Sequence, residues 1–249
     1  MSCIVSLRDK IIVITGAGSG IGRECAIKMS DQGARVVMLD LNPEGLQETR
    51  AVLHGEGHIT IPCDLSDFDC LPALVKDIIV ETGPIDGFVH CAGISSRKPL
   101  NVLKAKGFQK VMDVNFYSFV ELTRMFTKKG NMNDGGSIVV MSSISSIRGF
   151  KAKSEYCVSK AAVDAFVRCS ALELAPRRIR VNSVMAAEVL TPLALKAHET
   201  NAAVGATDFI APLGPSEPYE VANTIAFLLS DATKTITGTS LIIDGGALI

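Results

Sequence analysis

The chain has 249 residues, of which 47% are hydrophobic and 20% are charged, and its formal net charge is −1. This length and composition are typical of one globular domain with an ample core, so residues 1–249 are expected to form a single domain. The nearly balanced charge gives no electrostatic reason to expect binding to nucleic acid or to an anionic membrane.

Targeting and metal-binding patterns are also missing from the sequence. The first residues lack the long apolar core of a signal peptide, and no apolar run approaches the length needed to span a bilayer. The seven cysteines are scattered, with no Cys-x-x-Cys spacing for a metal or redox pair. We therefore expect a cytoplasmic protein with reduced thiols and no metal site.

The first predicted element is a buried strand at residues 10–15, a short and continuous apolar run. A glycine-rich stretch follows at residues 16–22, and a helix is expected over residues 23–32. A strand, a glycine turn and a helix in this order direct backbone N–H groups and a helix N-terminus at a phosphate. Because no Gly-Lys-Ser/Thr closes the stretch, it is not a P-loop.

The second strand, at residues 35–39, ends at Asp40. An acidic residue about twenty positions beyond the glycine turn can accept hydrogen bonds from an adenosine ribose, and it would repel the 2′-phosphate of NADP. Neither Gly18 nor Leu41 supplies a positive charge for that phosphate. The sequence therefore favours NAD as the nucleotide.

The rest of the chain continues the alternation of strands and helices. Further strands are expected at residues 58–63, 86–90, 137–141, 179–184 and 240–244, and helices at residues 43–54, 67–83, 104–129, 156–176 and 216–230. Residues 190–213 have no strong period and are expected to form a lid over the site. Seven strands alternating with helices predict a doubly wound parallel α/β sheet with helices on both faces.

Ligands of an open α/β sheet bind at the carboxyl ends of its strands. Five features fall at such ends, namely residues 16–22, Asp40, Asp64, Ala92-Gly93 and Ser143. The sequence therefore predicts a binding site along this edge.

Tyr156 and Lys160 lie four residues apart on an expected helix, so their side chains share one face. A free phenol has a pKa of about 10, and a neighbouring ammonium lowers it by favouring the phenolate. A hydroxyl such as that of Ser143 can hold a substrate oxygen beside the pair. These three residues are predicted to form an acid/base site that acts on a carbonyl or an alcohol. Their helix is apolar around much of its circumference, which predicts a contact between subunits.

With these residues the chain resembles the short-chain dehydrogenase/reductase family, in its compact single-domain branch, from about Leu7 to the Asp244-Gly245-Gly246 ending. The resemblance implies a Rossmann-type domain that binds NAD(P). It implies cofactor contacts from Gly16, Ser19, Gly20, Ile21, Gly22, Asp40, Leu41, Asp64, Leu65, Ala92, Gly93, Tyr156, Lys160, Val189 and Thr191. Asn115, Ser143, Tyr156 and Lys160 correspond to the catalytic tetrad of the family.

The resemblance also implies a role for each member of the tetrad. Tyr156 is expected to act as general base on an alcohol, or as acid on a ketone, while hydride moves between the substrate carbon and C4 of nicotinamide. Ser143 would orient the substrate oxygen. Lys160 would lower the pKa of Tyr156 and bind the ribose of the nicotinamide, and Asn115 would hold a water that links Lys160 to solvent.

Two positions depart from the family pattern. His90-Cys91 stands where the family has two asparagines, and His90 is expected to be a core or strand-end histidine, since no cluster of metal ligands surrounds it. Ala186-Ala187 stands where the family usually has Pro-Gly, which should let the backbone beside the nicotinamide take another path.

The expected function is an NAD(P)-dependent oxidoreductase, with NAD favoured, that transfers hydride between nicotinamide and a secondary alcohol or ketone with a largely apolar body. That body is inferred from the residues expected to line the pocket, which are Ile94, Ile144, Phe150, Ala187, Leu193 and Leu195. A homotetramer or homodimer is expected.

Three alternatives remain open. One is a 3-oxoacyl-carrier-protein or acyl-CoA reductase, in which Lys128-Lys129 and Arg177-Arg178 would meet an acidic carrier. The others are a non-catalytic NAD-binding scaffold and a sugar-nucleotide epimerase. An epimerase needs a larger substrate region after Val189 than this sequence contains.

Overall fold

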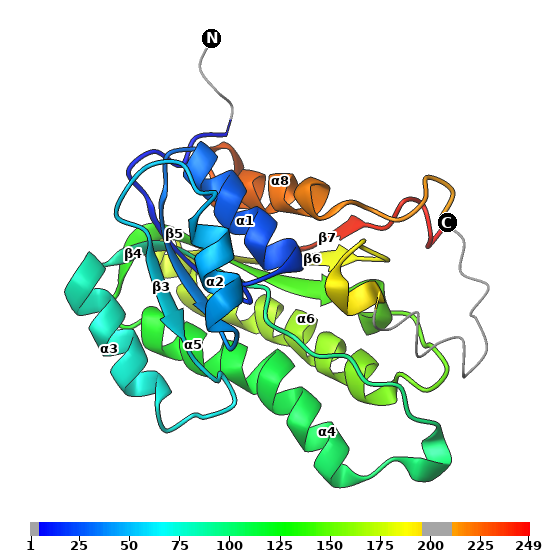
Figure 1. Ribbon diagram of the computed structural model, residues 1–249. Coiled ribbons are helices and arrows are strands. Elements are labelled where there is room, and N and C mark those ends of the chain that lie inside the picture. The colour runs from blue at the N-terminus through cyan, green and yellow to red at the C-terminus, as the bar shows by residue number, and fades with distance from the viewer. Residues whose placement is uncertain (1–4, 196–210) are drawn as a thin grey trace.

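The computed structural model describes residues 5–195 and 211–249 (Figure 1). The strands of this part are β1 (Ile11–Thr15), β2 (Arg35–Asp40), β3 (Ile59–Pro62), β4 (Ile85–His90), β5 (Met132–Ser143), β6 (Arg180–Ala186) and β7 (Ser240–Ile243). They form one sheet in the order β3-β2-β1-β4-β5-β6-β7, and every neighbouring pair is parallel. The predicted fold class is confirmed.

Helices cover both faces of the sheet (Figure 1). They are α1 (Gly20–Asp31), α2 (Pro43–Arg50), α3 (Leu71–Thr82), α4 (Ala105–Met112), α5 (Ser118–Phe126), α6 (Ser154–Leu174) and α8 (Pro218–Leu229). One hydrophobic cluster joins α1, α2 and α8 to one face, and a second joins α3, α5 and α6 to the other. Because the central strands are covered on both sides, they are continuous apolar runs in the sequence.

The helix expected at residues 104–129 is the least regular of these elements. In the structure α4 ends at Met112, a π-helical turn follows at Asp113–Tyr117, and α5 ends at Phe126. A π turn widens the helix by one residue and often occurs where a side chain has a function. The residue at the centre of this turn is Asn115, whose contacts are described below.

Several element boundaries differ from those expected. The helix expected at residues 67–83 begins at Leu71, because residues 64–70 form turns, with Asp67 N–H bonded to the carbonyl of Asp64 and Cys70 N–H to that of Asp67. Strand β5 starts five residues earlier than expected, and helix α2 ends at Arg50. Most of the lid expected at residues 190–213 lies outside the described residues.

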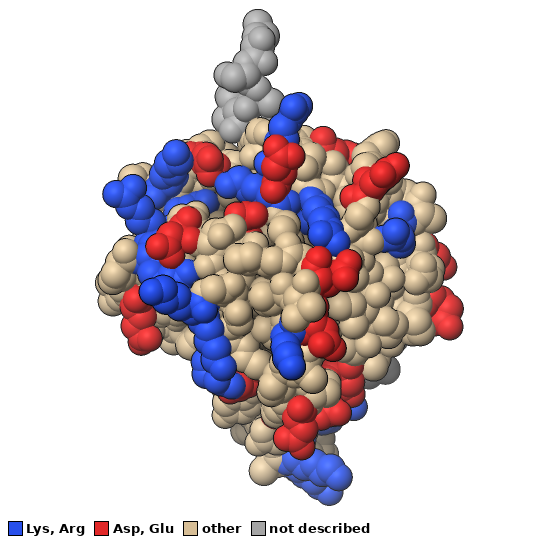
Figure 2. Space-filling view, turned by 90° about the vertical axis from the view of Figure 1, so that its left-hand side faces the viewer, with Lys and Arg blue, Asp and Glu red and all other residues tan. Residues whose placement is uncertain are grey.

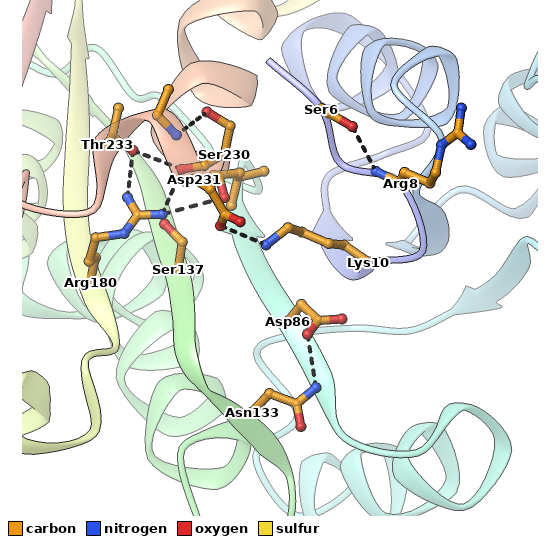
Figure 3. Close-up of polar contacts among 12 residues, drawn as sticks. Ser6, Arg8, Lys10, Asp86, Asn133, Ser137, Arg180, Ser230, Asp231 and Thr233 are labelled. Atoms are coloured by element: carbon orange, nitrogen blue, oxygen red, sulfur yellow. Dashed lines mark hydrogen bonds and ion pairs between the residues drawn. The ribbon is translucent and has the colours of Figure 1, made fainter. Parts of the chain in front are cut away.

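The amino ends of the strands are fastened by a buried arginine (Figure 3). Arg180, the first residue of β6, donates hydrogen bonds to the carbonyls of Leu228 and Ser230 and to the hydroxyl of Thr233. These acceptors are the last carbonyls of α8 and the turn after it, which have no partner within the helix. Burial lowers the pKa of Arg180, and the charge of Asp231 opposes that shift. Arg180 therefore ties α8 to the sheet.

The surface gives no sign of a membrane or metal function within the described residues. No helix there is long and apolar enough to cross a bilayer, and no group of three or more potential metal ligands occurs there. The six cysteines in that part of the chain are free thiols. On the face shown in Figure 2, basic and acidic side chains both occur, rather than one sign alone.

Candidate active site

The glycine turn between β1 and α1 is closely packed. A Cβ at Gly22 would lie 2.1 Å from the carbonyl oxygen of Gly16, and a Cβ at Gly16 would lie 2.8 Å from the backbone nitrogen of Ala92. Gly16 and Gly20 also have positive φ angles, of 69° and 53°. A Cβ at Gly20 would come within 3.2 Å of the Thr191 side chain. The turn, Ala92 and Thr191 thus meet at one edge of the sheet, and only glycine fits there.

The start of α1 remains open to an anion. Ser19 is the N-cap residue, but its side chain makes no capping hydrogen bond, and the first turn of α1 contains no acidic residue. A helix N-terminus carries a partial positive charge and N–H groups that have no partner within the helix. Ser19 and Ile21 lie at this end, beside the turn.

Asp40 lies at the carboxyl end of β2, against the glycine turn. Its carboxylate accepts one hydrogen bond from Gly18 N (2.9 Å) and another from Asn42 N (2.9 Å). Arg23 is the nearby cation that contacts the turn, and it donates to the carbonyl of Gly18 (2.6 Å) and to Glu48 (2.7 Å). Asp40 is therefore fixed at the turn, while Arg23 is held by an ion pair of its own.

Three other residues expected at the cofactor lie on neighbouring loops. Asp64 follows β3, and hydrogen bonds from the backbone and hydroxyl of Ser66 hold the pKa of its carboxyl below the usual range. Leu65 beside it is buried, whereas Leu41 is 70% exposed. Val189 follows β6 and is buried.

Asn115 holds together three segments of the site. Its amide oxygen accepts from Ile94 N (2.8 Å), and its amide nitrogen donates to Ile94 O (3.0 Å) and to Ser159 Oγ (3.0 Å). A Cβ at Gly93 would lie 3.4 Å from the Asn115 oxygen and 3.8 Å from Lys160 Nζ. The π turn thus pins the loop after β4 against α6, directly over Lys160. The sequence predicted Asn115 as a site residue but not these contacts, because they join segments far apart in the chain.

Ser143 and Tyr156 meet in a cavity of about 320 Å³. Ser143 is the last residue of β5, and its hydroxyl hydrogen-bonds with the phenol of Tyr156 and accepts from Ser145 N. Burial raises the pKa of Tyr156 to about 12, and the bond with Ser143 acts in the opposite direction. The direction of this pKa shift is the reverse of that expected from sequence, because burial outweighs the favourable neighbours.

Lys160 lies behind Tyr156, with its ammonium 5.7 Å from the centre of the tyrosine ring. It donates to the carbonyl of Met141 (2.7 Å), and burial lowers its pKa to about 8. The charge of Asp164, one helical turn further along α6, opposes this shift. Asp164 is itself buried and accepts hydrogen bonds from Ser142 (2.9 Å) and Ser183 (2.7 Å). The sequence analysis missed Asp164, although its i, i+4 spacing from Lys160 was a usable signal.

His90 is a fully buried histidine at the end of β4, as expected for a core or strand-end position. Its Nδ1 lies 3.0 Å from the Thr15 hydroxyl and its Nε2 lies 3.4 Å from that of Ser118. Since Ser118 already donates its proton to Val114 O (2.7 Å), Nε2 is the protonated nitrogen and Nδ1 accepts from Thr15. Burial, followed by the charge of Lys160, lowers the pKa of His90 to about 3. His90 is therefore a neutral link between β1 and the helix that carries Asn115.

The cavity wall includes more charge than the sequence predicted. Four of the six expected apolar residues line it, namely Ile144, Phe150, Ala187 and Leu193, whereas Ile94 and Leu195 do not. Arg97, Lys153 and Glu188 also line it. Lys153 lies one helical turn before Tyr156, which was a usable signal, but nothing in the local sequence places Arg97 there.

The residues that replace the family's Pro-Gly also lie at the cavity. Ala186 ends β6 and pairs with Ser143 in the sheet, and Ala187 N donates to the carbonyl of Ile243 (3.0 Å). The backbone therefore follows the sheet up to the cavity wall at this point.

Comparison with known proteins agrees with this arrangement. A family described as enoyl-(acyl carrier protein) reductase matches residues 16–247. The NAD-dependent glycerol dehydrogenase of Listeria innocua is 31% identical, over 98% of this chain and 96% of that protein. The chain belongs to the short-chain dehydrogenase/reductase family. It is an oxidoreductase that acts on alcohol or carbonyl groups, and its family binds a nicotinamide cofactor.

Two other relatives illustrate the range of the family. The 3-oxoacyl-(acyl-carrier-protein) reductase of Thermotoga maritima is 33% identical, over 98% of this chain and 99% of that protein. A solved short-chain dehydrogenase/reductase of Brucella melitensis, titled glucose/ribitol dehydrogenase, superposes with a TM-score of 0.89 at 30% identity, over 98% of this chain and 99% of that chain.

The residues at the sheet edge fit a dinucleotide. The start of α1 has no capping side chain and no carboxylate, so it suits a phosphate, and Asp40 at the end of β2 suits a ribose. The distances that join Gly20 to Thr191 and Gly93 to Lys160 make one continuous edge from the turn to the cavity.

Proposed function

We propose that this chain is an NAD-dependent dehydrogenase of secondary alcohols, which also reduces the corresponding ketones, with Asn115, Ser143, Tyr156 and Lys160 as its catalytic residues. The proposal rests above all on the position of Tyr156. Its ring lies near Lys160 on one side and bonds to Ser143 on the other, in a cavity at the same sheet edge as the glycine turn.

The cofactor would be held by the residues predicted from the sequence. Gly16, Ser19, Gly20, Ile21 and Gly22 would take the pyrophosphate at the start of α1. Asp40 and Leu41 would contact the adenosine ribose, and Asp64 and Leu65 the adenine. Ala92, Gly93, Tyr156, Lys160, Val189 and Thr191 would contact the nicotinamide half. When bound, nicotinamide accepts or supplies the hydride.

The choice of NAD over NADP is supported by Asp40 and Arg23. The carboxylate of Asp40 would repel a 2′-phosphate. Arg23 is engaged by Glu48 and by the carbonyl of Gly18, so its charge is already compensated at this site.

Tyr156 would take the proton from the substrate hydroxyl, or return it to a ketone oxygen. The protein by itself raises its pKa to about 12, so the phenolate needs additional positive charge. Lys160 supplies such charge when protonated, and Asp164 favours the protonated form. Ser143, already bonded to Tyr156, would hold the substrate oxygen between the two hydroxyls.

A carrier-protein reductase is a weaker candidate for this chain. Of the basic pairs that could meet an acidic carrier, Arg177 bonds to the carbonyls of Thr127 and Met132 and to Asp134. These contacts give Arg177 a structural role within its own chain. An epimerase or a scaffold is addressed by the test below.

The protein is proposed to work as a homotetramer or homodimer in the cytoplasm, with residues 1–249 as one domain. Support for the oligomer comes from α6, whose exposed face carries an apolar stripe at helical spacing. Val158 and Leu172 on this stripe are 48% and 80% exposed. An apolar helix face of this kind is favourable when a second subunit covers it.

The function is tested with a panel of secondary alcohols and ketones, each with NAD and NADP, by the absorbance of the reduced cofactor. Accumulation of reduced cofactor with an alcohol distinguishes a dehydrogenase from an epimerase, which returns its hydride. Tyr156→Phe should lower kcat about 100-fold or more, since general acid/base catalysis contributes that much, and should leave NADH binding, followed by its fluorescence, nearly unchanged. Retained turnover in Tyr156→Phe would refute the assignment.

A further inference from the structure

Two basic side chains face the cavity from opposite elements. Arg97 lies on the loop after β4, and Lys153 lies directly before α6 as its N-cap residue. Neither belongs to the acid/base group formed by Ser143, Tyr156 and Lys160. Their place in an otherwise largely apolar wall therefore needs an explanation of its own.

Arg97 is held in position from both sides. Ser96 and Lys98, its chain neighbours, both donate to the buried carboxylate of Glu155 on α6, and Lys98 N donates to the carbonyl of Ala152 (2.7 Å). These bonds fix the loop and leave the Arg97 side chain at the cavity.

The guanidinium of Arg97 lacks a complete set of partners. Its Nε is fully enclosed and has no hydrogen-bond partner among the residues that the structure describes. Burial lowers the pKa of Arg97, and within the described chain no neighbouring carboxylate raises it. An enclosed donor without an acceptor costs free energy, so this position is unfavourable unless something else accepts from it.

Lys153 lies on the substrate side of Tyr156. Its ammonium is 5.9 Å from the centre of the Tyr156 ring and 5.5 Å from that of Phe150. Burial and the charge of Arg97 lower the pKa of Lys153, while Cys157 and Glu188 raise it. Two cations that repel each other at a partly enclosed surface are typical of an anion-binding site. Glu188 compensates one positive charge at most, and it acts on Lys153 rather than on Arg97.

We infer that Arg97 and Lys153 form a subsite for an anionic group of the substrate, so that the enzyme acts on alcohols or ketones that carry a carboxylate or a phosphate. This inference rests on the proposed function and narrows its substrate class. Phe150, Ile144 and Leu193 line the same cavity and would contact the carbon skeleton. Because Lys153 lies close to Tyr156, the anionic group is separated from the reacting carbon by only a few bonds.

The first test compares substrates that differ only in charge. 3-Hydroxybutanoate and 4-hydroxypentanoate are each paired with their neutral primary amides, and kcat/KM is measured with NAD. The wild-type enzyme should prefer each acid to its amide by about 10-fold or more, the usual effect of one charged hydrogen bond. Turnover of both members of a pair at equal kcat/KM would overturn the inference and leave the proposed function intact.

Two variants link that preference to the subsite. Arg97→Gln and Lys153→Gln should each lower the acid-to-amide ratio about 10- to 100-fold, mainly through KM for the acid. Lys151→Gln removes the same charge at an exposed position two residues from Lys153 and should keep the wild-type ratio. Circular dichroism checks that all three variants are folded. An unchanged ratio in both subsite variants would contradict the inference.

The second test measures binding directly and separates the two proposals. Isothermal titration calorimetry with the NAD-loaded enzyme compares pentanoate, pentyl phosphate and pentanamide. Pentanoate or pentyl phosphate should bind to the wild type and about 10-fold or more weakly to Arg97→Gln, and the tighter of the two identifies the anion. If this holds while no alcohol or ketone is turned over, the anion subsite stands and the proposed function fails. Equal affinity for pentanamide and both anions would overturn the subsite.

Discussion

Replacing His90 by Asn should reduce the sensitivity of this protein to acid. His90 is fully buried, and in the folded state its pKa is lowered to about 3, against 6.5 for an ordinary histidine. Between these two values the unfolded chain binds a proton that the folded chain does not. The free energy of unfolding therefore falls as the pH falls from 6.5 towards 3.

The expected size of this effect follows from the shift. Each pKa unit corresponds to about 1.4 kcal/mol, so His90 alone removes about 2 kcal/mol of stability between pH 7.5 and pH 5, and about 5 kcal/mol by pH 3. Asn has no proton to bind in this range and fits the place that the family gives to asparagine. His90→Asn should therefore lose about 2 kcal/mol less than the wild type between pH 7.5 and pH 5.

The assay is urea unfolding followed by far-ultraviolet circular dichroism at several pH values, because the chain has no tryptophan for a fluorescence signal. The control is Val139→Ala, which removes buried apolar volume from β5 and should cost about 2 kcal/mol at every pH without changing the pH dependence. Equal losses for the wild type and His90→Asn would show that His90 is not kept neutral by burial, and the reasoning would be refuted.

Two further predictions concern the cofactor and the sheet. Asp40→Ser should weaken NAD binding about 10-fold or more and shift the preference towards NADP, because a carboxylate acceptor is lost and a 2′-phosphate is no longer repelled; calorimetry with both nucleotides measures this, and an unchanged NAD/NADP ratio would argue against a role for Asp40. Arg180→Met should lower the free energy of unfolding by about 3 kcal/mol, because buried carbonyls at the end of α8 lose their donor, whereas the exposed Arg50→Met should change it by less than about 0.5 kcal/mol. Similar values for the two arginine variants would contradict the structural role of Arg180.

Local sequence was sufficient for the parts of the site that depend on chain order. The apolar run of β1, the glycine stretch and the helix after it are neighbours in the chain, so their geometry follows from spacing and from the steric freedom of glycine. The carboxyl ends of parallel strands always meet at one edge, which placed Asp40 and Ser143 together before any coordinates were known. Four-residue spacing likewise brought Tyr156 and Lys160 to one face of α6.

The tertiary structure decided what surrounds those residues. Residues 104–129 have an ordinary helical pattern, and only the contacts of Asn115 with Ile94 and Ser159 accompany the π turn. The pKa of Tyr156 moves up rather than down, because the cost of burial depends on all atoms around the ring and not on the one ammonium that the sequence shows nearby.

The character of the substrate cavity also came from long-range contacts. Arg97 reaches the wall because its neighbours are bonded to Glu155, which lies some sixty positions further along the chain. A count of the apolar residues near Tyr156 in the sequence could not reveal that second cation beside Lys153. The sequence by itself thus determined the fold, the cofactor edge and the position of the acid/base pair, since these depend on local spacing. Burial and charge at the cavity were decided by the tertiary structure, since they are sums over residues that only folding brings together.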